Sequence, residues 1–173
     1  MDQKISLPAK TVAQSAVYDQ VYMIFPNDLN ANDTVFGGLI MAQMDRYSAV
    51  VADRHAGGVT VTAAVDAVHF IEPARRGDVL VFNVVVNRAW NSSMEVGCRV
   101  EAEAIKDGSR RHILSAYSTF VAMGADNKPR PVPPLTPITP AEVRRYGEAQ
   151  LRRELRLKHA QEMEKFRAQG NGT

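Results

Sequence analysis

The pattern that most constrains the fold is one helical stretch followed by four extended segments. From Leu39 to about His55 apolar residues recur at helical spacing, and Gly57-Gly58 stands where such a helix would end. An extended run precedes it and four follow, at residues 15–25, 59–71, 79–90, 94–105 and 112–123. Short connections between the later runs favour antiparallel neighbours. The sequence therefore predicts an α+β domain in which a long helix covers one face of an antiparallel sheet.

Composition shifts divide the chain into four parts. We expect an N-terminal tail over residues 1–14, the domain over 15–125, a Pro-rich linker over 126–139, and a C-terminal helix and tail over 140–173. Thr139, Pro140 and Glu142 have the spacing of a capping box with proline in the first turn. One helix cannot cover both faces of four long strands, so we expect a sheet face or edge to pack against a second subunit.

Composition also excludes several kinds of protein. The formal net charge of +2 gives no reason to expect nucleic acid as a partner. The single cysteine, Cys98, rules out a disulfide framework and fits a packed thiol in a cytoplasmic protein. The sequence has no secretory leader and no membrane-spanning run, and its scattered histidines predict no metal site. A serine-hydrolase elbow and nucleotide-binding glycine loops are also missing from the sequence.

The helix beginning near Gly37-Gly38 carries one carboxylate in an unexpected place. At helical spacing, Asp45 lies at the edge of the apolar face and not with the other polar residues. It is partly desolvated there and needs a hydrogen-bond partner. Glycines at a helix start let another molecule approach free backbone N–H groups, as in an oxyanion hole. Alone, the glycines equally fit a tight turn, and Asp45 fits a satisfied half-buried carboxylate; their combination favours a site.

The spacing of the two features points to two chains. Asp45 follows Gly38 by seven residues, or about 10 Å along a helix. One subunit's Asp45 is therefore too far to act on a carbonyl held at its own Gly38. We expect the helix start of one subunit to face Asp45 of another.

These motifs resemble those of the hotdog-fold acyl-CoA thioesterases, in the bacterial and organellar acyl-CoA hydrolase branch. The resemblance covers about Val17 to Met123. It is carried, in order, by Asn30, Phe36-Gly37-Gly38, Met44-Asp45, Thr62, Phe70, Pro73, Gly77-Asp78 and Ser92-Ser93. One departure is Ala89-Trp90-Asn91, where the family usually has a glycine before Ser-Ser.

The resemblance implies a fold, an activity and an assembly. The fold is a long helix wrapped by a curved antiparallel sheet, in homodimers that form homohexamers as trimers of dimers. The activity is hydrolysis of an acyl-CoA, with no cofactor because CoA is part of the substrate. In the family, residues matching Asn30 and Asp45 are catalytic and come from opposite chains, while the carboxylate is a general base or a nucleophile. Gly38 would help polarise the carbonyl, and Thr62 would support Asp45.

Binding CoA also requires cations and a surface for the adenine. Ser92 and Ser93 match the family turn where CoA passes, and Trp90 beside them is a candidate for stacking on adenine or for plain packing. Arg75-Arg76 are candidates for the CoA phosphates, as are Arg110-Arg111. Solvated turn charge is an equally simple explanation for either arginine pair.

Two rival functions remain open from the sequence. A hotdog 3-hydroxyacyl-thioester dehydratase would use a histidine base, which the loop before the helix and its first turns lack. A non-catalytic acyl-CoA sensor would keep the groove and use the C-terminal helix for output. In that helix arginines interleave with glutamates, which predicts a solvated helix with one apolar stripe. The stripe residues are Leu151, Leu155, Met163 and Phe166.

Overall fold

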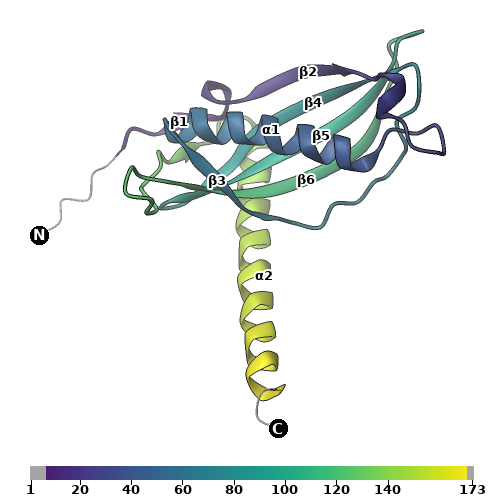
Figure 1. Cartoon of the computed structure of the whole chain (residues 1–173). Helices are drawn as coiled ribbons and strands as arrows, with labels where there is room; N and C mark the ends of the chain where they lie inside the picture. The colour runs from purple at the N-terminus through teal and green to yellow at the C-terminus, as the bar shows by residue number, and fades with distance from the viewer. Residues whose placement is uncertain (1–6, 171–173) are drawn as a thin grey trace, which may run out of the picture.

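The computed structural model describes residues 7–170, and Figure 1 shows them as a five-stranded sheet with one helix on each face. The elements are β1 (Lys10–Thr11), η1 (Val12–Gln14), β2 (Val17–Met23), η2 (Pro26–Asp28), α1 (Gly37–Ala56), β3 (Thr60–Val65), β4 (Asp78–Ala89), β5 (Ser93–Ala104), β6 (Arg110–Ala122), β7 (Leu135–Thr136) and α2 (Pro140–Gly170). Among the described residues, no helix is long and apolar enough to cross a membrane. The predicted α+β hotdog architecture is confirmed.

The sheet has the strand order β2-β4-β5-β6-β3, with every pair antiparallel. The expectation that all later strands are sequential neighbours is wrong for one pair. β3 pairs with β6 at one edge, and residues 66–77 carry the chain across to β4 on the other side. Turn length could not reveal this, because the partner of β3 arrives more than 40 residues later.

The predicted extended run 59–71 ends early as a strand, at Val65. Its ladder with β6 shifts register between Thr62 and Ala64. Beyond it the Asp66 N–H still donates to the Tyr117 carbonyl at 2.9 Å. The chain stays beside β6 as far as Ile71, whose N–H donates to the Ile113 carbonyl at 2.8 Å, and Phe70 lies against Gly37 at the start of α1.

α1 covers the inner face of the sheet with the apolar residues that its periodicity indicated. Ile40, Met44 and Val51 are buried, and the Tyr47 ring lies 5.1 Å from that of Phe82 on β4. Gly57 ends the helix in the left-handed region at φ 68°, where glycine avoids a side-chain clash. The helix and its predicted stop are therefore confirmed.

Residues predicted as tail and linker contact one another across the end of α1. β1 pairs in parallel with β7. The Lys10 ammonium donates to the Arg54 and His55 carbonyls at 2.7 and 2.9 Å, which neutralises the negative end of the α1 dipole. The domain boundaries stay predictions, but both segments pack on the domain.

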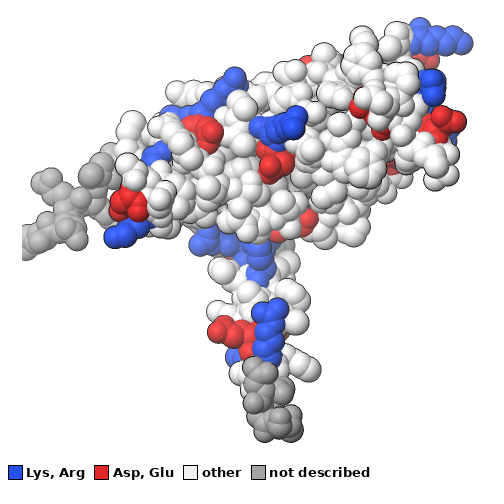
Figure 2. Space-filling view, viewed as in Figure 1, with Lys and Arg blue, Asp and Glu red and all other residues white. Residues whose placement is uncertain are grey.

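α2 begins with the predicted capping box. The Thr139 hydroxyl accepts from the Glu142 N–H at 3.2 Å, and the Glu142 carboxylate accepts from the Thr139 N–H at 3.0 Å. The first half of α2 crosses the outer face of the sheet, and the second half projects away from the body (Figures 1 and 2). The predicted stripe residues Leu151, Leu155, Met163 and Phe166 are exposed.

Candidate functional site

Asp45 lies half-buried on α1 and receives a hydrogen bond from the adjacent edge strand. The Thr62 hydroxyl donates to Asp45 Oδ1 at 2.9 Å. Because Thr62 sits where β3 shifts register against β6, the bulge aims this hydroxyl at the helix. The contact holds one carboxylate oxygen and fixes the orientation of the other. The sequence placed Thr62 beside Asp45 through the family resemblance, and the structure brings the two together.

The two glycines at the start of α1 are packed by aromatic rings. A Cβ on Gly37 would lie 3.2 Å from the Phe70 ring, and one on Gly38 would collide with Phe36. The helix begins without a side-chain cap, so its first N–H groups are not satisfied by an N-cap side chain. In the sequence Phe70 was only a motif residue, because its contact with Gly37 depends on the path of the crossing segment 66–77.

An open pocket of about 350 Å³ lies against this helix start. Gly37 and Ile40 line it from α1, and Phe70 and Pro73 line it from the crossing segment. The walls are mostly apolar, and Gly37 at the helix start is one of the lining residues. Such a pocket suits an acyl group whose polar end faces the helix N-terminus.

Asn30 makes its hydrogen bonds inside its own loop. Its amide oxygen accepts from the Asn32 N–H at 2.9 Å, and its amide nitrogen donates to the Thr34 hydroxyl at 2.9 Å. The side chain is exposed, while the loop is fixed around it. Within one chain Asn30 therefore lies in the loop that leads to the N-terminus of α1, whereas Asp45 lies farther along the helix, beside Thr62 of β3.

The arginines near the crossing segment differ in how they are held: Arg111 is bound within the fold, whereas Arg75 and Arg76 are exposed, and the Arg76 guanidinium lies 3.6 Å from the Asp33 carboxylate. Asp78 receives hydrogen bonds from the Arg111 guanidinium and, at 2.7 Å, from the Arg75 N–H. Burial opposes ionisation of Asp78, but these donors outweigh it and hold its pKa below the ordinary value. Arg111 is thereby committed to the fold, whereas the exposed Arg75 and Arg76 line a pocket of about 410 Å³. Glu72 and Pro73 line both this pocket and the apolar one.

The other predicted CoA contacts lie at the far end of β4. Trp90 donates from its indole nitrogen to Gln150 at 3.0 Å, and the Arg153 guanidinium lies 4.5 Å from its ring centre. The Ser93 hydroxyl accepts from Arg153 at 3.2 Å, and the Ser92 carbonyl accepts from the Ala122 N–H at 2.9 Å. This turn therefore packs against α2, an arrangement that the sequence did not predict.

One chain does not bring the predicted CoA-binding residues together. Arg75 and Arg76 precede β4, whereas Trp90, Ser92 and Ser93 follow it. Twelve residues of strand separate the two groups by roughly 36 Å. They can serve one bound CoA only if a second subunit contributes one of the groups.

Other reactive groups in the described part of the chain are structural. Cys98 is buried, and burial raises the pKa of its thiol to about 12, as expected for a packed thiol. His55 is fully buried and donates from Nε2 to the Pro133 carbonyl at 2.9 Å. Within residues 7–170 no group of three His, Cys, Asp or Glu side chains is placed to hold a metal ion.

Comparisons with known proteins agree on one family. The thioesterase superfamily model matches residues 32–109. The chain is 36% identical over 141 residues to the uncharacterized acyl-CoA thioester hydrolase YkhA of Bacillus subtilis, covering 80% of this chain and 82% of that protein. It is also 36% identical over 146 residues to mouse acyl-coenzyme A thioesterase 11; this match takes in 84% of this chain but only 25% of that protein.

Solved structures extend the match to nearly the whole chain. The acyl-CoA hydrolase of Bacillus cereus superposes with a TM-score of 0.86 at 34% identity, covering 92% of this chain and 97% of that one. A hexameric acyl-CoA thioesterase gives a TM-score of 0.86 at 35% identity over 89% and 98% of the two chains. The acyl-CoA hydrolase of Staphylococcus aureus, solved with butyryl-CoA and CoA, gives 0.83 at 32% identity over 93% and 99%. Related structures of that enzyme carry alanine in place of one Asn, one Asp or one Thr.

Proposed function

This chain belongs to the thioesterase superfamily, and we propose that it is an acyl-CoA thioester hydrolase whose active site is shared between two subunits. The reaction converts an acyl-CoA and water to a free carboxylic acid and CoA. The observation that carries the proposal is the carboxylate of Asp45, half-buried on α1 and oriented by Thr62. A positioned carboxylate is suited to act as general base or nucleophile at a thioester.

The water-activating route uses Asp45 as a base. The free carboxylate oxygen takes a proton from water while the water oxygen attacks the thioester carbon. The carbon–sulfur bond of the resulting oxyanion then breaks, and the leaving thiolate takes the proton from the Asp45 carboxyl group, which restores the carboxylate. In the alternative route the carboxylate attacks the carbonyl directly, CoA leaves as thiolate, and water hydrolyses the resulting anhydride.

Two subunits are needed to complete either route. Gly38 lies about 10 Å along α1 from Asp45, and Asn30 belongs to the loop at that same end. In our proposal one subunit supplies Asp45 and Thr62, and the other supplies Asn30 and the N–H groups at Gly38 for the oxyanion. Thr62 lies on β3, the last strand in the sheet order, where another chain can approach. Hexameric structures among the relatives support a homohexamer, and the shared site makes the homodimer its proposed unit.

The same pairing accounts for the separated CoA-binding residues. Arg75 and Arg76 of one subunit hold phosphate groups beside the apolar pocket. Ser92, Ser93 and Trp90 approach from the other subunit. A cytoplasmic location and the absence of nucleic-acid and membrane partners remain predictions from the sequence.

The alanine variants of the S. aureus enzyme support the choice of residues. The replaced Asn, Asp and Thr each stand two positions earlier in that chain than Asn30, Asp45 and Thr62 stand here. The three residue types, their order and both spacings therefore coincide.

A release assay for free CoA thiol tests the chemistry. We expect Asp45→Asn to lower kcat by about 10³-fold, because the amide can neither take a proton nor attack. Asp53→Asn is a matched control: Asp53 lies on the same helix and accepts from the Thr60 hydroxyl at 2.7 Å, a similar bond farther along. It should retain activity within about threefold. Full turnover by folded Asp45→Asn protein, or binding of acyl-CoA without thiol release by the unmodified protein, would overturn the proposal.

Mixed dimers test the shared site. Asn30→Ala and Asp45→Asn chains should each be inactive alone. Random pairing of the two chains regenerates one intact site in every mixed dimer, which gives about a quarter of the unmodified activity. If both residues served the same site from one chain, mixing would restore none.

A further inference from the structure

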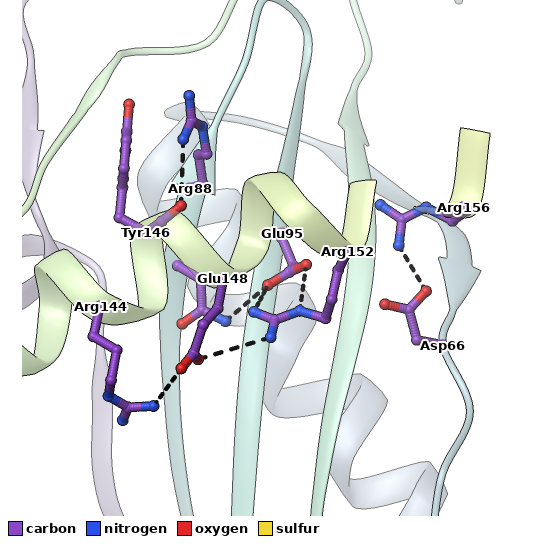
Figure 3. A network of polar contacts seen from close by, with 9 residues as sticks. Asp66, Arg88, Glu95, Arg144, Tyr146, Glu148, Arg152 and Arg156 are labelled. Carbon is purple, nitrogen blue, oxygen red and sulfur yellow. Dashed lines mark hydrogen bonds and ion pairs between the residues drawn. The ribbon is translucent and has the colours of Figure 1, made fainter. Parts of the chain in front are cut away.

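The docked half of α2 contacts the strands of the outer face one after another (Figure 3). Near its start, the Arg88 guanidinium of β4 donates to the Tyr146 carbonyl at 3.3 Å and lies 4.1 Å from the Tyr146 ring centre. Farther along, Arg152 reaches both β5 and β6. The last of these contacts, from Arg156, is at the end of β3.

The middle of this series is a buried ion pair. Glu95 on β5 is fully buried and accepts from Arg152 through both carboxylate oxygens, at 2.7 and 3.1 Å. The same guanidinium lies 3.6 Å from the ring centre of Tyr117 on β6. Burial disfavours the charge on Arg152, but Glu95 outweighs it and raises the pKa of Arg152. The two hydrogen bonds to Glu95 and the stacking on Tyr117 together allow α2 only one direction across the sheet at this point.

One helical turn later, Arg156 reaches the strand that carries Thr62. Its guanidinium donates to Asp66 Oδ1 at 2.6 Å, with about a quarter of each side chain exposed. Asp66 is the first residue after β3, and its N–H donates to the carbonyl of the same Tyr117 on which Arg152 stacks. The end of β3 is therefore held by a backbone bond from β6 and a side-chain bond from α2.

Asp66 lies midway between two parts of the proposed active site. Thr62, which bonds Asp45, is four residues before it, and Phe70, which packs on Gly37, is four residues after it. Within one chain β3 is an edge strand, and its ladder with β6 shifts register beside Thr62, so contacts beyond the ladder help to locate the hydroxyl. The bond from Arg156 to Asp66 is one such contact, and the Ile71 N–H, which donates to the Ile113 carbonyl at 2.8 Å, is another.

We propose that Arg156 is a positioning residue for catalysis: its bond to Asp66 holds β3 in the register that places the Thr62 hydroxyl on Asp45. The proposal rests on the proposed function, and it gives the docked half of α2 a role in turnover. Arg156 lies on the outer face and acts through the strand, without contacting substrate. A misplacement of about 1 Å in a catalytic hydrogen bond is enough to cost a large factor in rate.

Three variants test this contact, with acyl-CoA hydrolysis followed by thiol release. Arg156→Gln and Asp66→Asn each break the charge-assisted bond, and Arg156→Lys keeps a cation at that position. We expect the first two to lower kcat about tenfold with KM changed less than about twofold, because the acyl-CoA pockets are untouched. Arg156→Lys should recover part of the loss. Lys158→Gln, an exposed charge on the same helix, should behave as the unmodified protein.

A double-mutant cycle with Thr62→Ala separates positioning from general loss of structure. If Arg156 acts through Thr62, Arg156→Gln should lower kcat by less than about twofold in the Thr62→Ala protein. Equal tenfold losses in both backgrounds would overturn the proposal, as would unchanged kcat in folded Arg156→Gln protein. Either result leaves hydrolysis itself standing, provided that the unmodified protein is active and Asp45→Asn is not.

Discussion

α1 and α2 pack on opposite faces of one sheet, and different interactions hold them there. α1 buries a row of apolar residues, including Ile40, Met44 and Val51, against the inner face. On the outer face α2 buries Ala149 and is held chiefly by arginines that bond Glu95 and Asp66. Apolar burial stabilises many related arrangements, whereas bidentate ion pairs have one good geometry. The face that depends on charge is therefore the one that fixes a helix in a single orientation.

The largest stability effect should come from breaking the charged contact on one side only. Arg152→Met leaves Glu95 buried without its cation and should lower the free energy of unfolding by about 4 kcal/mol. Changing both partners, with Glu95→Met added, should recover most of that loss because no charge stays buried. Urea unfolding at one fixed protein concentration measures both.

A second arginine on the same helix provides the control for this pair. Within residues 7–170 the one ion pair of Arg144 is with Glu148 of the same helix, and the Arg144 side chain is 64% exposed. Arg144→Met should change the free energy of unfolding by less than about 1 kcal/mol. Equal losses from the two single variants would mean that burial of Glu95 does not set the energy of the outer face.

The next largest effect is the pH dependence of stability that comes from His55, which is buried at the end of α1. Burial lowers the pKa of His55 below its ordinary value of 6.5, and the neighbouring Lys10 ammonium acts in the same direction. Below pH 6.5 the unfolded chain therefore binds a proton at His55 more readily than the folded chain does. Stability from neutral His55 is present above pH 6.5 and is lost as the pH falls below it, by up to about 2 kcal/mol at pH 5.

His55→Gln tests this, because glutamine retains an N–H for the Pro133 carbonyl but does not titrate. The pH dependence of unfolding between pH 7 and 5 should be flatter in His55→Gln than in the unmodified protein. The comparison isolates His55 from Asp78, whose lowered pKa also costs stability in acid. His159→Gln, at an exposed position on α2, should leave the slope unchanged. Parallel pH profiles for His55→Gln and the unmodified protein would contradict the assignment.

The smallest effect should come from the first turn of α2. Thr139→Ala removes the hydroxyl that accepts the Glu142 N–H and should lower the free energy of unfolding by about 1 kcal/mol. Thr139→Ser keeps the acceptor and should stay close to the unmodified protein. Thermal unfolding monitored by circular dichroism resolves the difference. A loss as large as that of Arg152→Met would mean that the cap, and not the ion pair, holds α2 in place.

The same contrast explains how much could be predicted from the sequence. α1, its glycine stop, the five strands of the main sheet and the α2 cap depend on residues close together in the chain. Periodicity indicated the helix and the strands, although β3 ends earlier than expected, and the glycine pair and the capping-box spacing indicated the stop and the cap. Asp45 was conspicuous for the same reason, because a local pattern showed a charge out of place.

Long-range contacts were not predictable in this way. The crossing from β3 to β4 exists because β3 pairs with the distant strand β6, and the local sequence around β3 does not indicate which strand it pairs with. The arginines of α2 alternate with glutamates as in a solvated helix, so nothing local distinguishes Arg152 from Arg144. The difference lies in Glu95, some 57 residues away, whose burial only the assembled sheet reveals.

One small feature on β5 has a consequence for how this sequence can change over time. A Cβ at Gly97 would collide with the Asn87 amide, which donates to Glu95 at 3.0 Å. A larger residue at 97 would displace Asn87. The Glu95 carboxylate would then lose the hydrogen bond from Asn87 that supports its ion pair with Arg152. Positions 87, 95, 97 and 152 should therefore covary in lineages that retain the docked α2, and diverge independently in those that have lost it.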